Sequence, residues 1–298
     1  MGNRAADSPR TSSDQCNFLN HVRQPIVTRV RSSEAGRYSG FMTSPENSPA
    51  KQLTLSSGLI VRELSNYGEL KQACQLYRGV FGYTGEDESL NPRMLSSLLR
   101  HSGSVVGAVD PSGTVLAFAY GWAAVDTGDD PHVYHFSQAA VVSSVLQGQG
   151  VGRSLKRVQA AMAERSGAQR MRWTYDPLMA RNAHFNLDVL GACGRWYTPD
   201  AQGLPGTDRV TVEWRFTDDD ALSSPQTAEE ARTPHVPVGE LRTDANGTHL
   251  GVPAAKPVDP DLAARLRQQI RGVFEEGYAA ISCFRTDPHT AVYTFLKD

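Results

Sequence analysis

A short glycine-rich segment near the middle of the chain limits the folds that are open to it. The segment consists of Gln147, Gly148, Gln149, Gly150, Val151 and Gly152. Residues 132–142 before it alternate between two side-chain faces, as a β-strand does, and residues 151–165 after it carry apolar side chains at helical spacing. The first turn of a helix leaves backbone N–H groups unpaired and carries partial positive charge, so the sequence predicts an anion site in this loop.

The spacing of the glycines narrows the chemistry of that anion. Because glycines lack Cβ atoms, a diphosphate can approach the backbone, and Arg153 and Lys156 are expected to add positive charge nearby. A nucleotide-binding P-loop is excluded, because no Lys-Ser or Lys-Thr pair follows the glycines. The dinucleotide fingerprint fails on glycine spacing, although the position of Asp176 keeps a weak version of it open.

Elsewhere in the chain, segments with apolar residues at strand spacing alternate with segments at helical spacing. This order predicts a mixed α/β domain of the α+β type. Helices are expected at residues 67–81, 151–165 and 180–191 and after the capping pairs Asn91-Pro92 and Asp259-Pro260. Strands are expected at residues 58–64, 105–109, 114–125, 132–142, 171–175, 210–216, 280–284 and 291–296. Several antiparallel strands lead into one strand–loop–helix–strand crossover, so the central sheet is expected to be mixed, mostly antiparallel and flanked by helices.

The domain boundaries are predicted from where this periodic pattern begins and where it is interrupted. Residues 1–57 are polar and aperiodic and are expected to form a disordered N-terminal tail, because they bury too little apolar surface to offset ordering. Residues 58–298 are expected to form a single domain, with a polar insertion or linker at about 217–257 that is rich in Pro, Thr and Gly.

Charge and cysteine content narrow the function classes. The formal net charge is −2 and charged residues make up 21% of the chain, which argues against a nucleic-acid partner. No apolar run approaches the roughly 20 residues that span a bilayer, so no membrane association is expected. The four cysteines are scattered and form no C-x-x-C pair, which favours a cytoplasmic location and indicates neither a disulfide framework nor a metal site.

Two motifs resemble a known enzyme superfamily. Residues 142–152 resemble the end of the fourth strand, the pyrophosphate loop and the helix start of the GNAT N-acetyltransferases. Residues 173–178 (WTYDPL) and 181–192 resemble a little-characterised bacterial subgroup with the motif WT(F/Y)DPL…RNAxxNLxxLGA, and residues 208–214 resemble that subgroup's next strand. The resemblance covers about residues 58–298 and implies a GNAT-like acyl-CoA N-acyltransferase fold.

The resemblance also implies a co-substrate, acetyl-CoA or another acyl-CoA, whose acyl group passes to an amine. A β-bulge on the fourth strand would aim backbone N–H groups at the acyl carbonyl. The implied coenzyme contacts are Ala140, Val141 and Val142 at that bulge, Gln147, Gly148, Gln149, Gly150, Val151, Gly152 and Arg153 in the loop, and Asn182. For Asn182, capping of its own helix is an equal alternative.

The catalytic candidates are His135, Asp176 and Tyr197. The superfamily's usual tyrosine acid would stand four residues before Gly191, where this chain has Leu187, so Tyr197 is the substitute if the chain folds back. His135 could act as a general base, although a strand histidine is more often a packed, hydrogen-bonded residue. Asp176 stands at a strand end, where a turn hydrogen bond or a helix cap is the alternative role.

A small-molecule amine is expected as the acceptor, because the chain shows no peptide-recognition module. The acidic loop at residues 82–88 could hold the positive charge of that amine, or could be a solvated turn. A non-catalytic acyl-CoA-binding regulator is one alternative function, motivated by the missing tyrosine. A GNAT-fold enzyme that acts on another acyl thioester is a second alternative, and a homodimer stays open.

Overall fold

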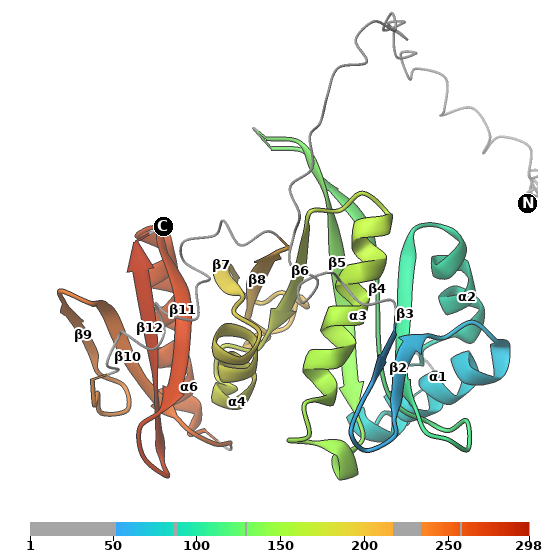
Figure 1. The fold of residues 1–298 in the computed structure, drawn as a ribbon. Helices are drawn as coiled ribbons and strands as arrows, with labels where there is room; N and C mark the ends of the chain where they lie inside the picture. The colour runs from blue at the N-terminus through green and yellow to red at the C-terminus, as the bar shows by residue number, and fades with distance from the viewer. Residues whose placement is uncertain (1–51, 86–88, 129, 217–233, 257, 298) are drawn as a thin grey trace, which may run out of the picture. The chain divides into compact units, whose positions relative to one another are not determined.

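Twelve strands form one sheet in the described part of the chain (Figure 1). The computed structural model describes residues 52–297, apart from 86–88, 129, 217–233 and 257. The strands are β1 (Gln52–Thr54), β2 (Ile60–Glu63), β3 (Gly103–Val109), β4 (Val115–Asp126), β5 (His132–Val142), β6 (Arg170–Tyr175), β7 (Cys193–Thr198), β8 (Arg209–Arg215), β9 (Leu241–Asp244), β10 (Gly247–Pro253), β11 (Tyr278–Arg285) and β12 (Thr290–Lys297). Across the sheet their order is β1-β2-β3-β4-β5-β6-β8-β7-β11-β12-β10-β9.

Among these strands, β5 and β6 are the neighbours that run parallel, and all other neighbours run antiparallel.

The helices are α1 (Tyr67–Phe81), α2 (Pro92–Arg100), α3 (Val151–Arg165), α4 (Ala180–His184) and α6 (Pro260–Glu275), with a 3-10 turn η1 (Ser144–Leu146) and a π-helical turn η2 (Phe185–Val189). Helix α3 makes the crossover between the parallel strands. The predicted fold class, a mixed and mostly antiparallel sheet flanked by helices, is confirmed.

Helices cover both faces of the sheet between β2 and β5. Leu70 of α1 shares a core cluster with Phe118 of β4, whereas Leu155 of α3 shares a different cluster with Ala117 and Ala119 of the same strand. Successive residues of a strand point to opposite faces, so α1 lies on one face and α3 on the other. The glycine-rich loop at residues 147–152 therefore follows a part of the sheet that is covered by helices on both faces.

Helix boundaries follow the capping residues that the sequence predicted. The Asn91 side chain accepts a hydrogen bond of 2.8 Å from the Arg93 amide at the start of α2, with Pro92 as the first helical residue. Asp259 caps α6 in the same way, and Pro260 again occupies the first helical position. These local signals act within one turn, which is why they can be recognised without knowledge of the tertiary structure.

The C-terminal strands extend the sheet beyond β7 through a narrow junction. Ala280 of β11 and Gly194 of β7 form the register pair that joins the two parts. Side chains on both sides of the junction nevertheless share one hydrophobic core, which includes Trp173 of β6 and Ile270 of α6. The predicted terminal helix and hairpin are confirmed as α6, β11 and β12.

Several elements differ from the sequence prediction. Strand β1 lies within the stretch assigned to the tail, and β9 and β10 lie within the stretch assigned to a linker. Strand β7 was not predicted, and the helix expected at residues 180–191 continues after α4 as the π-helical turn η2. Residues 1–51 and 217–233, on which other parts of those predictions fall, lie outside the described residues.

None of the helices in the described ranges combines the length and the apolar character that crossing a bilayer requires.

Candidate functional site

The sheet opens between β5 and β6. The two strands pair through His135 with Met171 and Phe136 with Arg172, and no further pair joins them in the described residues. Beyond these pairs, β5 stays hydrogen-bonded to β4 as far as Val142, and β6 stays bonded to β8. The facing edges of β5 and β6 therefore diverge towards the end of β5 that leads into the glycine loop.

A β-bulge lies on β5 at this opening. Tyr120 of β4 pairs with Ala139, and the next residue of β4, Gly121, pairs with Ser137, so Gln138 is the extra residue. The resemblance placed the bulge at residues 140–142, but these residues pair regularly with β4. The bulge thus lies two residues earlier than expected, and a bulge at this point increases the local twist of β5 away from β6.

The glycines of the loop have two different structural roles. Gly148 and Gly150 have φ angles of +80° and +74°, and a Cβ atom at either position would meet nothing within 4 Å. Their hydrogen side chains are needed for the left-handed backbone conformation. Gly152 differs, because a Cβ atom there would lie 3.1 Å from the Phe185 ring. Gly152 therefore clears space for η2, and its expected contact with a ligand stays a prediction.

The start of α3 presents unpaired backbone amides to the loop. Gly150 is the N-cap, and no side chain caps the helix. The Ser154 amide donates to the Gly150 carbonyl at 3.1 Å, so the amides of the first three helical residues have no partner one turn earlier. No acidic residue stands in the first turn, and Arg153 is exposed there. This arrangement suits an anion, as the sequence predicted.

Lys156 does not supply charge to the loop, contrary to the expectation from sequence. Its side chain is 3% exposed and its ammonium nitrogen lies 2.8 Å from the Ser137 hydroxyl oxygen. The same nitrogen lies 3.9 Å from the centre of the Trp173 ring. Burial lowers the pKa of Lys156 well below its usual range, because the charged form loses its hydration.

Lys156 is one end of a buried polar network that the sequence analysis missed. The Ser137 hydroxyl donates to Gln159 Oε1 at 2.8 Å, and Gln159 Nε2 donates to the Ser104 hydroxyl at 2.9 Å. The Ser104 hydroxyl oxygen lies 2.9 Å from His135 Nε2. A signal was available, because positions 156 and 159 lie one helical turn apart beside the apolar stripe of α3.

His135 is packed inside this network. It is 1% exposed, its Nδ1 atom has no hydrogen-bond partner among the described residues, and a Cβ atom at Gly121 would lie 2.7 Å from its Nε2. Burial, followed by the charge of Lys156, lowers the pKa of His135 to about 4. His135 is therefore neutral at pH 7 and sealed from solvent, which is the packed, hydrogen-bonded alternative.

Asp176 and Asn182 lie after β6. Asp176 Oδ1 accepts a hydrogen bond of 2.9 Å from the Leu178 amide, and its Oδ2 accepts one of 2.6 Å from Lys256. The turn hydrogen bond considered for Asp176 is thus present. Met179, not Asn182, is the N-cap of α4, so the capping role considered for Asn182 is wrong. Asn182 is exposed.

Tyr197 lies on β7 against α6. Its ring centre is 5.9 Å from that of Phe274, and burial together with the Asp208 carboxylate raises the pKa of its hydroxyl. The described contacts do not join Tyr197 to His135 or Asp176, so the structure does not assemble the three catalytic candidates into one group. The three acidic residues of the loop at 82–88, residues 86–88, lie outside the described residues.

No group of three or more His, Cys, Asp or Glu side chains in the described part of the chain could hold a metal ion. The opening between β5 and β6, the bulge at Gln138 and the loop of residues 147–153 therefore make up the candidate site. It offers a ligand backbone groups, the exposed Arg153 and the exposed side chains of three glutamines, Gln138, Gln147 and Gln149.

Several of the solved structures that are similar to this chain are acetyltransferases. A GNAT-family acetyltransferase from Desulfovibrio desulfuricans matches with 13% identity and a TM-score of 0.44, over 53% of this chain and 99% of that one. Aminoglycoside 6'-acetyltransferase type Ii matches with 15% identity and a TM-score of 0.42, over 53% of this chain and 97% of that one. A GCN5-related N-acetyltransferase from Kribbella flavida matches with 19% identity and a TM-score of 0.40, over 53% and 98% of the two chains. No protein-family model and no curated protein sequence matches this chain.

Proposed function

We propose that this chain is an acyl-CoA-dependent N-acyltransferase that transfers acetyl from acetyl-CoA to the amine of a small molecule. The observation that carries the proposal is the divergence of the parallel strands β5 and β6 directly before the unpaired N-terminus of α3. The two features are joined by one short loop, so a single extended ligand can use both.

The chemistry of acyl-CoA fits these two features. Its diphosphate is an anion that the amides at the start of α3 can bind, and Arg153 adds an exposed positive charge. Its pantetheine arm carries amide groups along an extended chain, which can bond to an open strand edge as an added peptide strand does. With the diphosphate at Gly150, the arm runs towards Gln138, which puts the thioester near the bulge.

Transfer of the acyl group needs few catalytic side chains. The neutral amine attacks the thioester carbonyl, and backbone N–H groups near the bulge stabilise the oxyanion. The coenzyme then leaves as a thiolate, which takes up the proton that the amine nitrogen loses. Holding the two substrates together supplies much of the rate, because a reaction between bound groups avoids the entropy cost of an encounter. Under this proposal the sealed His135 takes no proton from the amine.

One observation favours a non-catalytic acyl-CoA-binding regulator as a second candidate. Leu187, at the position where the resemblance places a tyrosine acid, is 2% exposed in the core. Release of free coenzyme A in the presence of an amine library separates the two candidates, and mass analysis of products from several acyl-CoAs separates acetyl transfer from other thioester chemistry.

Two substitutions at Gly150 test the coenzyme site. Asn and Asp are nearly the same size and both tolerate positive φ better than other residues, so Gly150→Asn controls for shape and backbone strain. Gly150→Asp adds a negative charge beside the diphosphate. Two like charges at about 4 Å repel by about 4 kcal/mol at an effective dielectric constant near 20, which corresponds to several hundred-fold in affinity.

Isothermal titration calorimetry with coenzyme A is the measurement. We expect Gly150→Asn to bind within about tenfold of the parent and Gly150→Asp to bind several hundred-fold more weakly. Equal affinities of two folded variants would show that the loop is only a turn, and the proposed function would then lose its foundation.

A further inference from the structure

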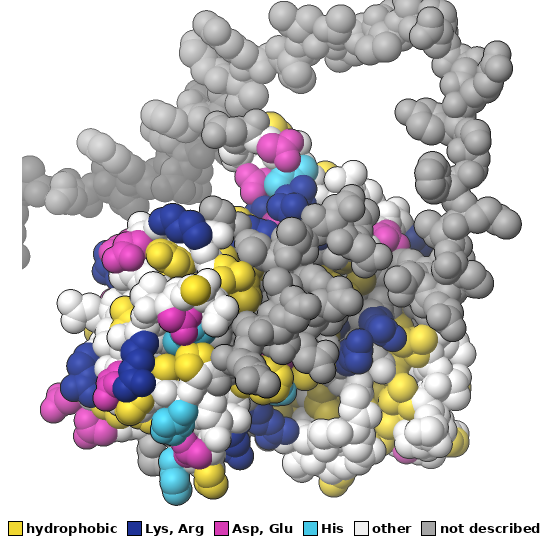
Figure 2. All heavy atoms as spheres, turned by 60° about the vertical axis from the view of Figure 1, so that its left-hand side comes forward, with side chains coloured by type: hydrophobic (Ala, Val, Ile, Leu, Met, Phe, Trp, Pro, Cys, Tyr) yellow, Lys and Arg dark blue, Asp and Glu magenta, His cyan; other side chains and the backbone are white. Residues whose placement is uncertain are grey.

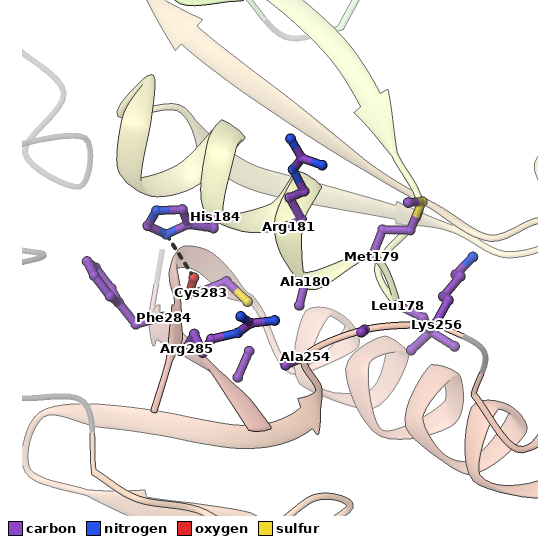
Figure 3. Close-up of a pocket in the computed structure, with 12 residues that line it drawn as sticks. Leu178, Met179, Ala180, Arg181, His184, Ala254, Lys256, Cys283, Phe284 and Arg285 are labelled. Atoms are coloured by element: carbon purple, nitrogen blue, oxygen red, sulfur yellow. Dashed lines mark hydrogen bonds between the residues drawn. The ribbon is translucent and has the colours of Figure 1, made fainter. Parts of the chain in front are cut away.

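A second site lies on the far side of α4 from the glycine loop. A cleft of about 580 Å³ opens between α4 and the ends of β10, β11 and β12 (Figure 3). We call it the basic cleft; it is lined by Leu178, Met179, Ala180, Arg181, His184, Ala254, Ala255, Lys256, Cys283, Phe284, Arg285 and Ala291. None of these residues belongs to α3 or to the loop that precedes it.

The charged side chains of the basic cleft are all of one sign. Arg181, Lys256 and Arg285 line it, and no carboxylate does among the described residues. Lys256 is neutralised by Asp176, at 2.6 Å, but neither arginine forms an ion pair with any described residue. Three positive charges less the charges of Asp176 and of Asp188, which contacts the lining His184, leave a formal charge of +1 when His184 is neutral.

This segregation differs from the mixed distribution of charge on the face that Figure 2 shows. The chain has a formal net charge of −2, and the face in Figure 2 shows basic, acidic and hydrophobic side chains interspersed. Like charges that share a concave surface repel each other, and the low-dielectric walls strengthen the effect. An anion bound between them would relieve that repulsion.

The floor of the basic cleft is apolar. Leu178, Ala180, Ala254 and Ala291 are buried residues that line it, and Phe284 stands at its edge with 40% of its surface exposed. Small side chains on the floor leave room above them. A ligand that fills the cleft therefore needs an apolar body as well as a negative charge.

The two walls are fixed to each other by one carboxylate. Asp188, just after α4, accepts hydrogen bonds from the Ser282 hydroxyl at 2.7 Å and from the Cys283 amide at 3.0 Å. The same carboxylate lies 3.0 Å from His184 Nδ1. Because these bonds join η2 directly to β11, the cleft is formed before a ligand arrives, and binding costs little rearrangement.

We propose that the basic cleft binds a small organic anion, with a carboxylate or phosphate group held by Arg285 and an apolar body on the alanine floor. Arg285, at the end of β11, lies beside Cys283 and Ala254, whereas the Arg181 side chain extends from α4 away from it (Figure 3). Guanidinium groups pair with either anion through two parallel hydrogen bonds, so both headgroups share the same recognition chemistry. The proposal stands on the cleft alone and does not depend on the proposed acyl transfer.

Four probes test both halves of this ligand by calorimetry on the full chain. Benzoate and phenyl phosphate carry the anion and the apolar ring, benzamide carries the ring alone, and inorganic phosphate carries the anion alone. We expect one or both of the complete probes to bind at millimolar concentration and each half-probe to bind at least about tenfold more weakly. The stronger of the two complete probes identifies the headgroup. Absence of binding by both would overturn the proposal.

Variants locate the bound probe. Arg285→Gln should weaken it by roughly 10-fold to 100-fold, as expected for loss of a charge-assisted hydrogen bond, and Arg181→Gln, which removes a more distant charge, should weaken it less. Arg93→Gln, an exposed arginine on α2, is the matched control and should change nothing. If the arginine variants melt like the parent and still bind the probe fully, the anion sits elsewhere and the proposal fails.

The glycine loop is the competing location. Gly150→Asp should keep the parent's affinity for the probe, and a saturating probe should not displace coenzyme A. Loss of probe binding in this variant would assign the anion to the loop and overturn the proposal. Failure of coenzyme A binding in the parent would count against the proposed function and leave the basic cleft untouched.

Discussion

At the scale of single residues, the helical pattern predicts the buried face of α3 but does not predict that the Lys156 side chain is buried. The pattern predicts the buried face of α3 from Leu155 and its apolar neighbours, and that face is confirmed. Lys156 turns inwards beside Leu155 because the opening between β5 and β6 offers it the Ser137 hydroxyl and the Trp173 ring. The spacing of residues in the sequence contains no information about that opening. The sequence therefore predicts an exposed lysine at position 156, whereas the structure has a buried one.

The pKa of His135 predicts how stability depends on pH. Its pKa falls from the usual 6.5 to about 4 on folding, so the unfolded chain binds more protons between these values. Stability therefore falls as pH is lowered through this window, by about 3 kcal/mol in total from this residue. We expect urea unfolding of the parent between pH 7 and pH 4 to show about 3 kcal/mol more loss than unfolding of His135→Asn.

His101→Asn is the control for this measurement, because His101 is an exposed residue at the end of α2. It should lose stability in parallel with the parent. If His135→Asn also parallels the parent down to pH 4, then His135 is not a buried neutral residue.

At the scale of elements, the packing of η2 on α3 depends on Gly152. A Cβ atom at this position would lie 3.1 Å from Phe185 Cζ, so alanine must push the ring by a few tenths of an ångström. We expect Gly152→Ala to cost more stability in the parent than in a Phe185→Leu background. The coupling energy should be about 0.5–1 kcal/mol in a double-mutant cycle measured by urea unfolding.

Gly79→Ala is the reference for this cycle. Gly79 lies within α1, and a Cβ atom there would meet nothing within 4 Å. Alanine should stabilise α1 by about 0.5–1 kcal/mol in either background, because it removes the entropy cost of a helical glycine. A coupling energy near zero at Gly152 would mean that η2 does not rest on α3.

Elements with strong local signals could be predicted from sequence, and elements defined by their partners could not. Helix α1 matches its predicted range because Asn66 caps it and Gly82 ends it in a left-handed conformation. All four residues of β9 are exposed, so the strand has no apolar alternation and exists through its pairing with β10. The π-helical turn η2 likewise has no local breaker; within it, Asn186 accepts a hydrogen bond of 2.8 Å from Trp173.

The same distinction applies to the two sites. The glycine loop could be predicted because its strand, its glycines and its helix are contiguous in the chain. The basic cleft could not, because it brings together residues near 180, 255 and 285 that meet only when β11 pairs beside β7. Its two unpaired arginines look like ordinary surface residues until that pairing is known.

At the scale of the whole molecule, the C-terminal strands are part of the core that supports the site. Leu266, Ile270 and Tyr293 are fully buried and share one cluster with Met171 and Trp173 of β6. Each large apolar side chain contributes about 1.5–3 kcal/mol on burial, so these three residues alone approach the 5–15 kcal/mol that typically stabilises a domain.

Deletion of residues 257–298 should therefore abolish the cooperative fold. The truncated chain is expected to be insoluble or to show no thermal transition by circular dichroism, whereas the full chain melts in one step. A soluble truncated protein with a sharp transition would show that α6, β11 and β12 form a separate module, and the shared core would then be incidental.

The single register pair between Ala280 and Gly194 also determines where the molecule yields under mechanical tension. Strands joined by a long hydrogen-bonded ladder resist shear because many bonds carry the force at once, whereas packed side chains separate one after another. A pull between β2 and β12 meets long ladders except between β5 and β6, which pair at two positions, and between β7 and β11, which pair at one. The C-terminal strands should come away there as one piece, and the walls of the basic cleft, which belong to opposite sides of this boundary, would part in the same event.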